Sequence, residues 1–150
     1  MDLLRFRVWI KTEKCMIETD DLLDIDYENK EIVTQQVYFE NGLPDDRDIY
    51  CYDFDEIELM QSTDMVDRDG KIIFEGDIVK MAKDVYSEPT YYEVVRHYGG
   101  AYRLESKQHG CELWLRHTEC EVVGNVYENK ELMEAMEHEN KNINGNNHQC

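Results

Sequence analysis

Two acidic residues flank a glycine near the middle of the chain, and this arrangement could do chemistry. Glu75 and Asp77 stand on either side of Gly76. A pair of carboxylates can act as general acid and base when burial raises the pKa of one of them. The alternative role is structural: the Asp77 carboxylate accepts hydrogen bonds from backbone N–H groups in a turn, and Glu75 faces solvent or pairs with a lysine. We favour the structural role; a pocket with an apolar wall would favour the catalytic one.

Two histidines and two cysteines form a second candidate site. His109, Cys111, His117 and Cys120 are residue types that bind zinc in tetrahedral sites. Their spacing, H-x-C-x5-H-x2-C, matches no common zinc motif, and both cysteines also suit strands as small apolar residues. We therefore expect no metal ion and no other cofactor.

Other catalytic motifs are missing from the sequence. It contains no Gly-x-Ser-x-Gly, and none of its cysteines has a recognisable catalytic context. Gly99-Gly100 is followed neither by Lys-Ser/Thr nor by a helix start, so we expect no phosphate-binding loop. We predict that the protein is not an enzyme. A hydrolase that uses Glu75 and Asp77 is only the third hypothesis, after the two binding functions given at the end of this section.

The composition is strongly acidic. The chain has 34 acidic residues against 16 basic ones, which gives a formal net charge of −18. Such a charge repels phosphate backbones, so direct binding to nucleic acid is not expected. An acidic surface is usually just a solvated one, but it can also imitate DNA and occupy the basic groove of another protein.

The location is predicted from apolar runs and from cysteines. No apolar run reaches the roughly 18 residues of a membrane helix, and the first residues lack the profile of a signal peptide. The cysteines form an odd set without a C-x-x-C motif, at Cys15, Cys51, Cys111, Cys120 and Cys150. Reduced thiols of this kind are typical of the cytosol. We expect a cytoplasmic protein without membrane contact.

Short strands are the elements that must position these residues. Alternating or β-branched runs predict strands at residues 4–10, 31–39, 56–61, 72–79, 91–98, 101–104, 111–115 and 121–127. Asp69-Gly70 supplies a tight turn, and Gly76 permits a corner that curls the sheet. We predict a mainly β fold, a small SH3-like or coiled-sheet barrel with an N-terminal β extension and a short C-terminal helix.

The helix is predicted after Asn129, which suits the N-cap and precedes the apolar pair Leu132 and Met133. No linker divides the chain convincingly, although the acidic stretch after residue 45 is its weakest point. We predict one domain over residues 1–137 and a disordered, Asn-rich tail over residues 138–150.

Aromatic residues are the best candidates for a binding surface, because Tyr and Trp supply much of the energy at protein interfaces. Trp9 alternates to the face opposite Phe6, which favours an interface. Tyr50 and Tyr52 suit an interface and a core equally well. Trp114 is expected in the core.

Three sequence blocks resemble the YopX family of phage and prophage proteins. They are Arg5 to Trp9 with the later Met16, Met60 to Val79, and Glu121 to Asn129 with the following Glu131-Leu132. Ile10 and Asp64 replace an Asp and a Gly of the family pattern. The turn residues within these blocks are Asp69, Gly70, Glu75, Gly76, Asp77, Gly124 and Asn125. The resemblance implies a largely β fold with coiled sheets, a phage or prophage origin, and no established activity.

The preferred function is a non-enzymatic module for protein binding or assembly in the cytoplasm of a bacterial host cell. Its partner is an unidentified protein, and exposed strand edges favour self-association into a homo-oligomer. The alternative is an acidic inhibitor that imitates nucleic acid and occupies the basic cleft of a host enzyme.

Overall fold

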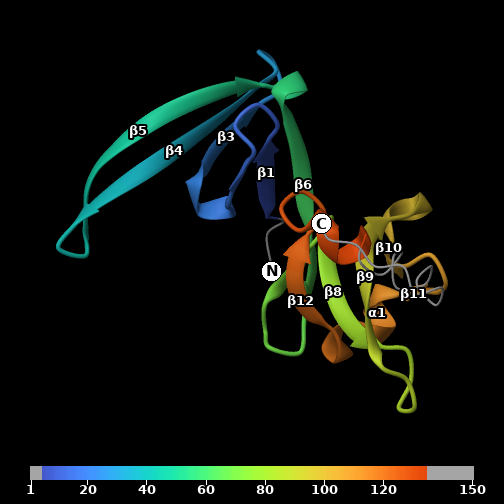
Figure 1. Ribbon diagram of the computed structural model, residues 1–150. Helices are drawn as coiled ribbons and strands as arrows, with labels where there is room; N and C mark the ends of the chain where they lie inside the picture. Colours follow the sequence, from blue (N-terminus) through green and yellow to red (C-terminus); the bar gives the residue numbers. More distant parts are fainter. Residues whose placement is uncertain (1–4, 135–150) are drawn as a thin grey trace. The chain divides into compact units, whose positions relative to one another are not determined.

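The computed structural model describes residues 5–134, apart from the side chain of Tyr98. Its elements are mainly strands, as predicted (Figure 1). The chain divides into two compact units, Met1–Gln61 and Ser62–Cys150, called here the N-terminal and C-terminal units. The predicted single domain over residues 1–137 stays a prediction, and the predicted tail over residues 138–150 lies outside the described residues.

The N-terminal unit contains two groups of antiparallel strands. Strand β1 (Phe6–Ile10) lies between β2 (Cys15–Ile17) and the first half of β6 (Ile57–Val66). The second group has the order β3 (Leu22–Asp26), β4 (Glu31–Glu40), β5 (Leu43–Asp53). Two 3-10 helices, η1 (Thr19–Asp21) and η2 (Phe54–Glu56), lead into β3 and β6. A small core forms where the two groups contribute Val8, Ile10, Ile32 and Ile57.

Strand β1 confirms most of the alternation predicted for residues 4–10. Val8 and Ile10 are fully buried. Alternation places Arg7 on the face opposite Val8 and Ile10, but Arg7 is buried as well. The aliphatic part of an arginine side chain packs well against apolar surface, so alternation alone does not assign its face.

Strands β4 and β5 form a long hairpin that the sequence predicted only in part. Figure 1 shows the two ribbons running together well past the end of β3. Asn41 and Gly42 join them with φ angles of 55° and 79°. Positive φ at both positions is the signature of a two-residue type I′ turn, which matches the twist of paired strands. We call residues 36–50 of this hairpin the arm.

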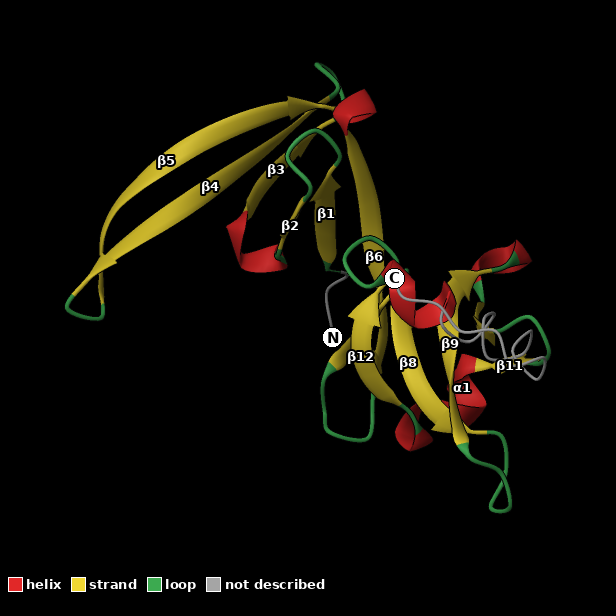
Figure 2. Cartoon of the chain, viewed as in Figure 1, coloured by secondary structure: helices red, strands yellow, loops and turns green. Residues whose placement is uncertain are grey.

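The C-terminal unit is built on a five-stranded antiparallel sheet with the order β11-β10-β9-β8-β12. Its strands are β8 (Asp77–Ala82), β9 (Pro89–Arg96), β10 (Tyr102–Glu105), β11 (Gly110–Glu112) and β12 (Glu121–Asn125). This sheet curls strongly, as Figure 2 shows for β8, β9 and β12. Strand β7 (Ile72–Phe74) pairs with the second half of β6. The core of the unit includes Val79, Tyr92, Val94 and Leu104, which are almost completely buried.

Residues 111–115 differ from the predicted strand. The strand ends at Glu112, and it is followed by helix α1 (Leu113–Arg116) and then by the 3-10 segment η4 (His117–Glu119). Leu113 is buried, but Trp114 is 63% exposed, so its predicted place in the core is wrong. Leu113, Trp114 and Leu115 lie on one helical turn instead of a strand, and of these three only Leu113 is buried.

The C-terminal helix is confirmed at its start, because residues 130–134 are helical. Asn129 precedes it, and its backbone oxygen accepts a hydrogen bond from the N–H of Leu132 at 3.0 Å. Among the described residues, no helix is long and apolar enough to cross a membrane.

Candidate interaction surface

The acids beside Gly76 belong to a turn between β7 and β8. Asp77 is buried, and its Oδ2 accepts a hydrogen bond from the N–H of Phe74 at 2.8 Å. Gly76 has a φ of +87°, a conformation that favours glycine. Glu75 lies 4.0 Å from the guanidinium of Arg96, not beside a lysine. The contact of Asp77 is the turn contact that the sequence suggested, and it supports the structural role of this motif.

A neighbouring acid that the sequence analysis missed organises the turn at Asp69-Gly70. The buried Asp67 carboxylate accepts N–H bonds from Asp69 and Lys71 at 2.9 Å each, and from Val122 at 2.8 Å. Burial raises the pKa of Asp67, but these three backbone donors outweigh it and hold the pKa below its usual value. Asp67 therefore fixes the β6–β7 turn and attaches it to β12, while Asp69 itself is exposed.

Gly124 and Asn125 organise the turn at the end of β12, where the Asn125 side chain accepts backbone hydrogen bonds as the Asp67 side chain does in the β6–β7 turn. Asn125 Oδ1 accepts hydrogen bonds from the N–H groups of Tyr127 and Glu128 at 3.0 and 2.9 Å. Asn129 Oδ1 in turn accepts the Asn125 N–H at 3.1 Å. A Cβ atom on Gly124 would stand only 2.4 Å from that Oδ1, so the close approach requires glycine. All these contacts are structural.

The histidines and cysteines proposed as zinc ligands have separate surroundings. Cys120 is buried, and its thiol donates to the backbone oxygen of His117 at 3.2 Å. The ring nitrogen Nδ1 of His117 lies 2.8 Å from the backbone oxygen of Val66. The ring of His109 packs edge-on against Tyr92. Among the described residues, no three of these four side chains place their ligand atoms close enough together to hold one metal ion.

The acids Asp53, Asp55 and Glu56 do gather closely, with one carboxylate oxygen from each within 4.8 Å of the others. They lie at the exposed start of η2, where Glu56 Oε1 accepts a hydrogen bond from the Asp53 N–H at 3.4 Å. A reciprocal contact of this kind is a helix-capping box. Capping explains why the acids meet here.

The arm presents the densest group of exposed apolar side chains in the N-terminal unit. Phe39 and Leu43, next to its tip, are 66% and 68% exposed, and three further side chains are exposed along it: Tyr38, Ile49 and Tyr50. An isolated exposed apolar residue is normal, but a group of five on one projecting hairpin is not. Within residues 5–134, no strand pairs with the outer edge of β5.

Tyrosine and aspartate side chains stiffen the same hairpin. The Tyr38 hydroxyl donates to Asp48 Oδ2 at 2.8 Å, and the Tyr50 hydroxyl approaches the same oxygen at 3.4 Å. The hydrogen bond to Asp48 is the main reason that the pKa of Tyr38 rises to about 12. The Tyr38 contact joins β4 to β5, whereas the Tyr50 contact lies within β5. Together they preorganise the arm, and preorganisation lowers the entropy cost of binding.

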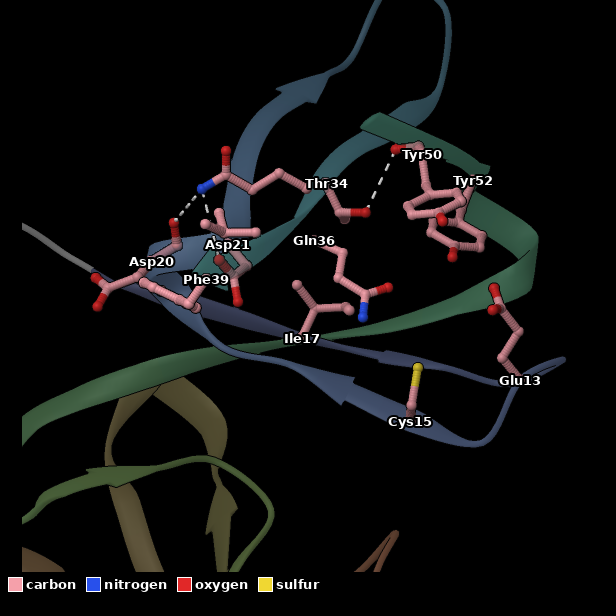
Figure 3. A pocket seen from close by; sticks show the side chains of 12 residues that line it. Glu13, Cys15, Ile17, Asp20, Asp21, Thr34, Gln36, Phe39, Tyr50 and Tyr52 are labelled. Atoms are coloured by element: carbon pink, nitrogen blue, oxygen red, sulfur yellow. Dashed lines mark hydrogen bonds between the residues drawn. The ribbon is translucent and has the colours of Figure 1, made fainter. Parts of the chain in front are cut away.

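A cavity of about 690 Å³ lies beside the arm within the N-terminal unit (Figure 3). Strands β2, β4 and β5 and helix η1 contribute its walls. Tyr50 and Tyr52, two of the predicted interface residues, line it from β5. Burial, and then a hydrogen bond with Glu13, raise the pKa of Tyr52. The third predicted residue, Trp9, is half-buried on β1 opposite Met16 and Glu58, so an interface role for it stays a prediction.

The family of the chain is decided by a match over most of its length. The family model described as YopX protein matches residues 5–134. The chain belongs to the YopX family. No curated protein matches it.

Two solved structures resemble this chain in fold. The crystal structure of protein EF1440 from Enterococcus faecalis is 26% identical, has a TM-score of 0.57, and is aligned over 89% of this chain and 99% of its own. The crystal structure of protein yopX from Bacillus subtilis is 22% identical, with a TM-score of 0.59 and coverage of 85% and 96%. The second likeness concerns the fold alone.

Two of the sequence blocks that resemble the YopX family contain the turn residues described above. The central block supplies Asp67, Gly76 and Asp77, and the last block supplies Gly124 and Asn125. Asp67, Asp77 and Asn125 accept backbone hydrogen bonds, Gly76 has a positive φ, and Gly124 leaves the space that the Asn129 side chain occupies. The arm and its aromatic residues lie between the first two blocks. The motif that identifies the family and the surface that offers contacts are therefore different parts of this chain.

Proposed function

We propose that this protein is a non-enzymatic protein-binding module whose binding element is the arm, residues 36–50. The observation that carries the proposal is the exposure of Phe39 and Leu43 on a paired, projecting hairpin. Exposed aromatic and aliphatic groups of this kind are what partners bury at the centre of an interface.

The chemistry of the arm favours a basic partner. Its acids are Glu40, Asp45, Asp46 and Asp48, and Arg47 is its one basic residue. Acids on an edge strand oppose pairing with a second strand of like charge, and Pro44 removes one backbone donor from that edge. A second copy of a chain with net charge −18 is also repelled at long range. We therefore propose a partner other than a second copy, in place of the homo-oligomer.

The test compares three baits in a bacterial lysate at low salt, with the captured proteins quantified by mass spectrometry. The baits are the wild type, the double variant Phe39→Ser/Leu43→Ser, and the control Val85→Ser/Tyr86→Ser. Val85 and Tyr86 are 90% and 95% exposed in the loop before β9, so the control removes apolar groups that are even more exposed than Phe39 and Leu43 and lie outside the arm. We expect a partner that the wild type and the control retain and that the arm variant loses.

Two results would contradict the proposal. One is equal capture by the arm variant and the wild type, which would show that the arm contributes nothing. The other is an oligomer that dissociates in the arm variant, measured by multi-angle light scattering, because the arm would then contact a second copy. Circular dichroism of each variant checks that the strands are intact.

An acidic inhibitor that imitates nucleic acid is the second candidate, and the acids of the arm favour it. It requires that the captured partner binds nucleic acid through the same basic surface. Addition of duplex DNA to the captured complex distinguishes the two functions. Release of the partner by DNA supports the inhibitor, and retention supports an interface separate from the nucleic-acid site.

A further inference from the structure

We infer that the cavity beside the arm is a binding site for an extended, lysine- or arginine-bearing segment of the partner protein. The inference rests on the proposed function, which it deepens by naming the chemistry of the ligand. Its basis is the combination of aromatic rings, carboxylates and an open strand edge around one cavity.

The charged side chains that line the cavity are all acidic; Arg47, which does not line it, donates a hydrogen bond to the lining residue Gln35 at 2.9 Å. Glu13, Asp20 and Asp21 contribute carboxylates from the β1–β2 turn and from η1. Among the described residues that line the cavity, none is a lysine, arginine or histidine. The carboxylates are therefore not neutralised by cations of the lining, and a cationic group is the complement that this wall favours.

Aromatic rings accompany the carboxylates at both ends of the cavity. Figure 3 draws Tyr50, Tyr52 and Glu13 at one end, and Phe39, Asp20 and Asp21 at the other. A ring face and a carboxylate together attract an ammonium or guanidinium group, the first through its quadrupole and the second through its charge. The middle of the cavity is neutral, lined by Thr34, Gln36 and Ile17. Two cationic groups separated by a neutral segment fit this pattern.

The edge of β4 favours an extended chain as the carrier of these cations. Strand β3 pairs with β4 no further than Leu22 opposite Thr34. Within residues 5–134, no strand covers the same edge of β4 from Gln36 onward, and Gln36, Val37 and Phe39 all line the cavity. An extended segment can add its backbone to such an edge while its side chains enter the cavity.

The experiment uses the full-length protein and a short fluorescent peptide in which lysine alternates with valine. Fluorescence anisotropy measures its affinity for the wild type and for Glu13→Gln/Asp20→Asn/Asp21→Asn. The control is Asp24→Asn/Glu28→Gln/Asp55→Asn, which removes the same number of charges from exposed positions of the same unit that neither line the cavity nor belong to the arm. We expect about tenfold weaker binding to the cavity variant, since each exposed ion pair contributes modestly, and less than about twofold change in the control.

A further variant tests the aromatic contribution separately. Tyr50→Leu keeps an apolar side chain on β5 but removes the ring face. We expect it to weaken the lysine peptide by about threefold and to leave any residual binding of a leucine-valine peptide unchanged, because only the cation gains from the ring. Equal weakening of both peptides would show that Tyr50 supplies apolar area and would contradict its role toward a cation.

Several results would overturn the site itself. They are failure of the lysine peptide to bind the wild type at low salt, equal weakening in the cavity and control variants, and displacement of the peptide by an equal concentration of spermine, which would indicate a site for free polyamines. If the peptide fails while the arm-dependent partner is still captured, the cavity site falls and the proposed function stands. If the arm variant captures the partner as well as the wild type does, the proposed function itself falls.

Discussion

The carboxylate of Asp67 accepts a hydrogen bond from the backbone N–H of Val122 at 2.8 Å, across a separation of 55 residues in the chain. The other oxygen of the same carboxylate holds the N–H groups of Asp69 and Lys71. One buried side chain thus attaches the β6–β7 turn to β12. Its three acceptor contacts need a group with two oxygens and no N–H donor of its own.

Replacement of Asp67 by Asn is expected to destabilise the protein by about 1–3 kcal/mol. The amide has one oxygen instead of two, so its NH2 group must face at least one of the backbone N–H donors. Chemical denaturation monitored by circular dichroism measures the loss. The control is Asp69→Asn in the same turn, which is exposed and should change the free energy of unfolding by less than about 0.5 kcal/mol. Equal effects of the two variants would contradict the role of Asp67.

The same carboxylate makes the free energy of unfolding depend on pH in the acidic range. Burial raises the pKa of Asp67, but the three backbone donors hold it below its usual value. A group with a lowered native pKa stabilises fully above its unfolded pKa, about 4, and loses this contribution as the pH falls through the native pKa. The stability difference between the wild type and Asp67→Asn should therefore be constant from about pH 5 to 7 and shrink below about pH 4. A difference that grows on acidification would contradict this assignment.

Substitution of Gly124 by Ala is expected to cost about 1–3 kcal/mol, because the new Cβ would stand 2.4 Å from the Asn129 Oδ1. The pair can be tested by a double-mutant cycle with Asn129→Gly, which removes the side chain in the way. In that background the Gly124→Ala substitution should cost clearly less than it does in the wild type. Additive effects would place the cost in the backbone conformation rather than in this contact.

The Tyr38 hydroxyl should titrate well above an ordinary tyrosine. Its hydrogen bond to Asp48 contributes most to a pKa of about 12, compared with the usual value of about 10. NMR of ring-labelled tyrosine, assigned with Tyr38→Phe, should show a protonated Tyr38 at about pH 10.5 in the wild type and a largely ionised one, about three quarters at a pKa of about 10, in Asp48→Asn. Asp45→Asn, also on β5, should leave the titration unchanged. A titration of wild-type Tyr38 near pH 10 would contradict the hydrogen bond in solution.

The buried thiol of Cys120 should be unreactive in the native protein. Burial raises its pKa to about 12, so almost none of it is thiolate at neutral pH. Iodoacetamide labelling followed by peptide mass spectrometry should modify the exposed Cys51 at once and Cys120 only after unfolding. Labelling of Cys120 at the rate of Cys51 under native conditions would contradict its burial.

The sequence predicted the strands whose residues alternate or are β-branched, and it missed those whose residues are acidic. Strand β5 contains Asp45, Asp46, Asp48 and Pro44, all unfavourable in strands, yet the Asn41-Gly42 turn and pairing with β4 hold it. Here tertiary pairing outweighs local propensity.

The candidate site, too, could be predicted from the sequence only in part. The turn residues around Gly76 could be found because glycine and acid spacing are local signals. The cavity could not, because its walls come from five separate segments: the β1–β2 turn, β2, η1, β4 and β5. Tyr50 and Tyr52 were named as interface candidates by residue type alone, and the lining residues Glu13 and Asp21 carry no signal of their own in the sequence.

Strand β6 runs without interruption through the boundary between the two units. Gln61 pairs with Phe6 of β1, and the next residue, Ser62, pairs with Phe74 of β7. Strand β6 thus pairs first with β1 and then with β7 along its length. Separate expression of the two units therefore requires fragments that both contain Ile57–Val66, because a cut at the boundary would leave each fragment with half of β6.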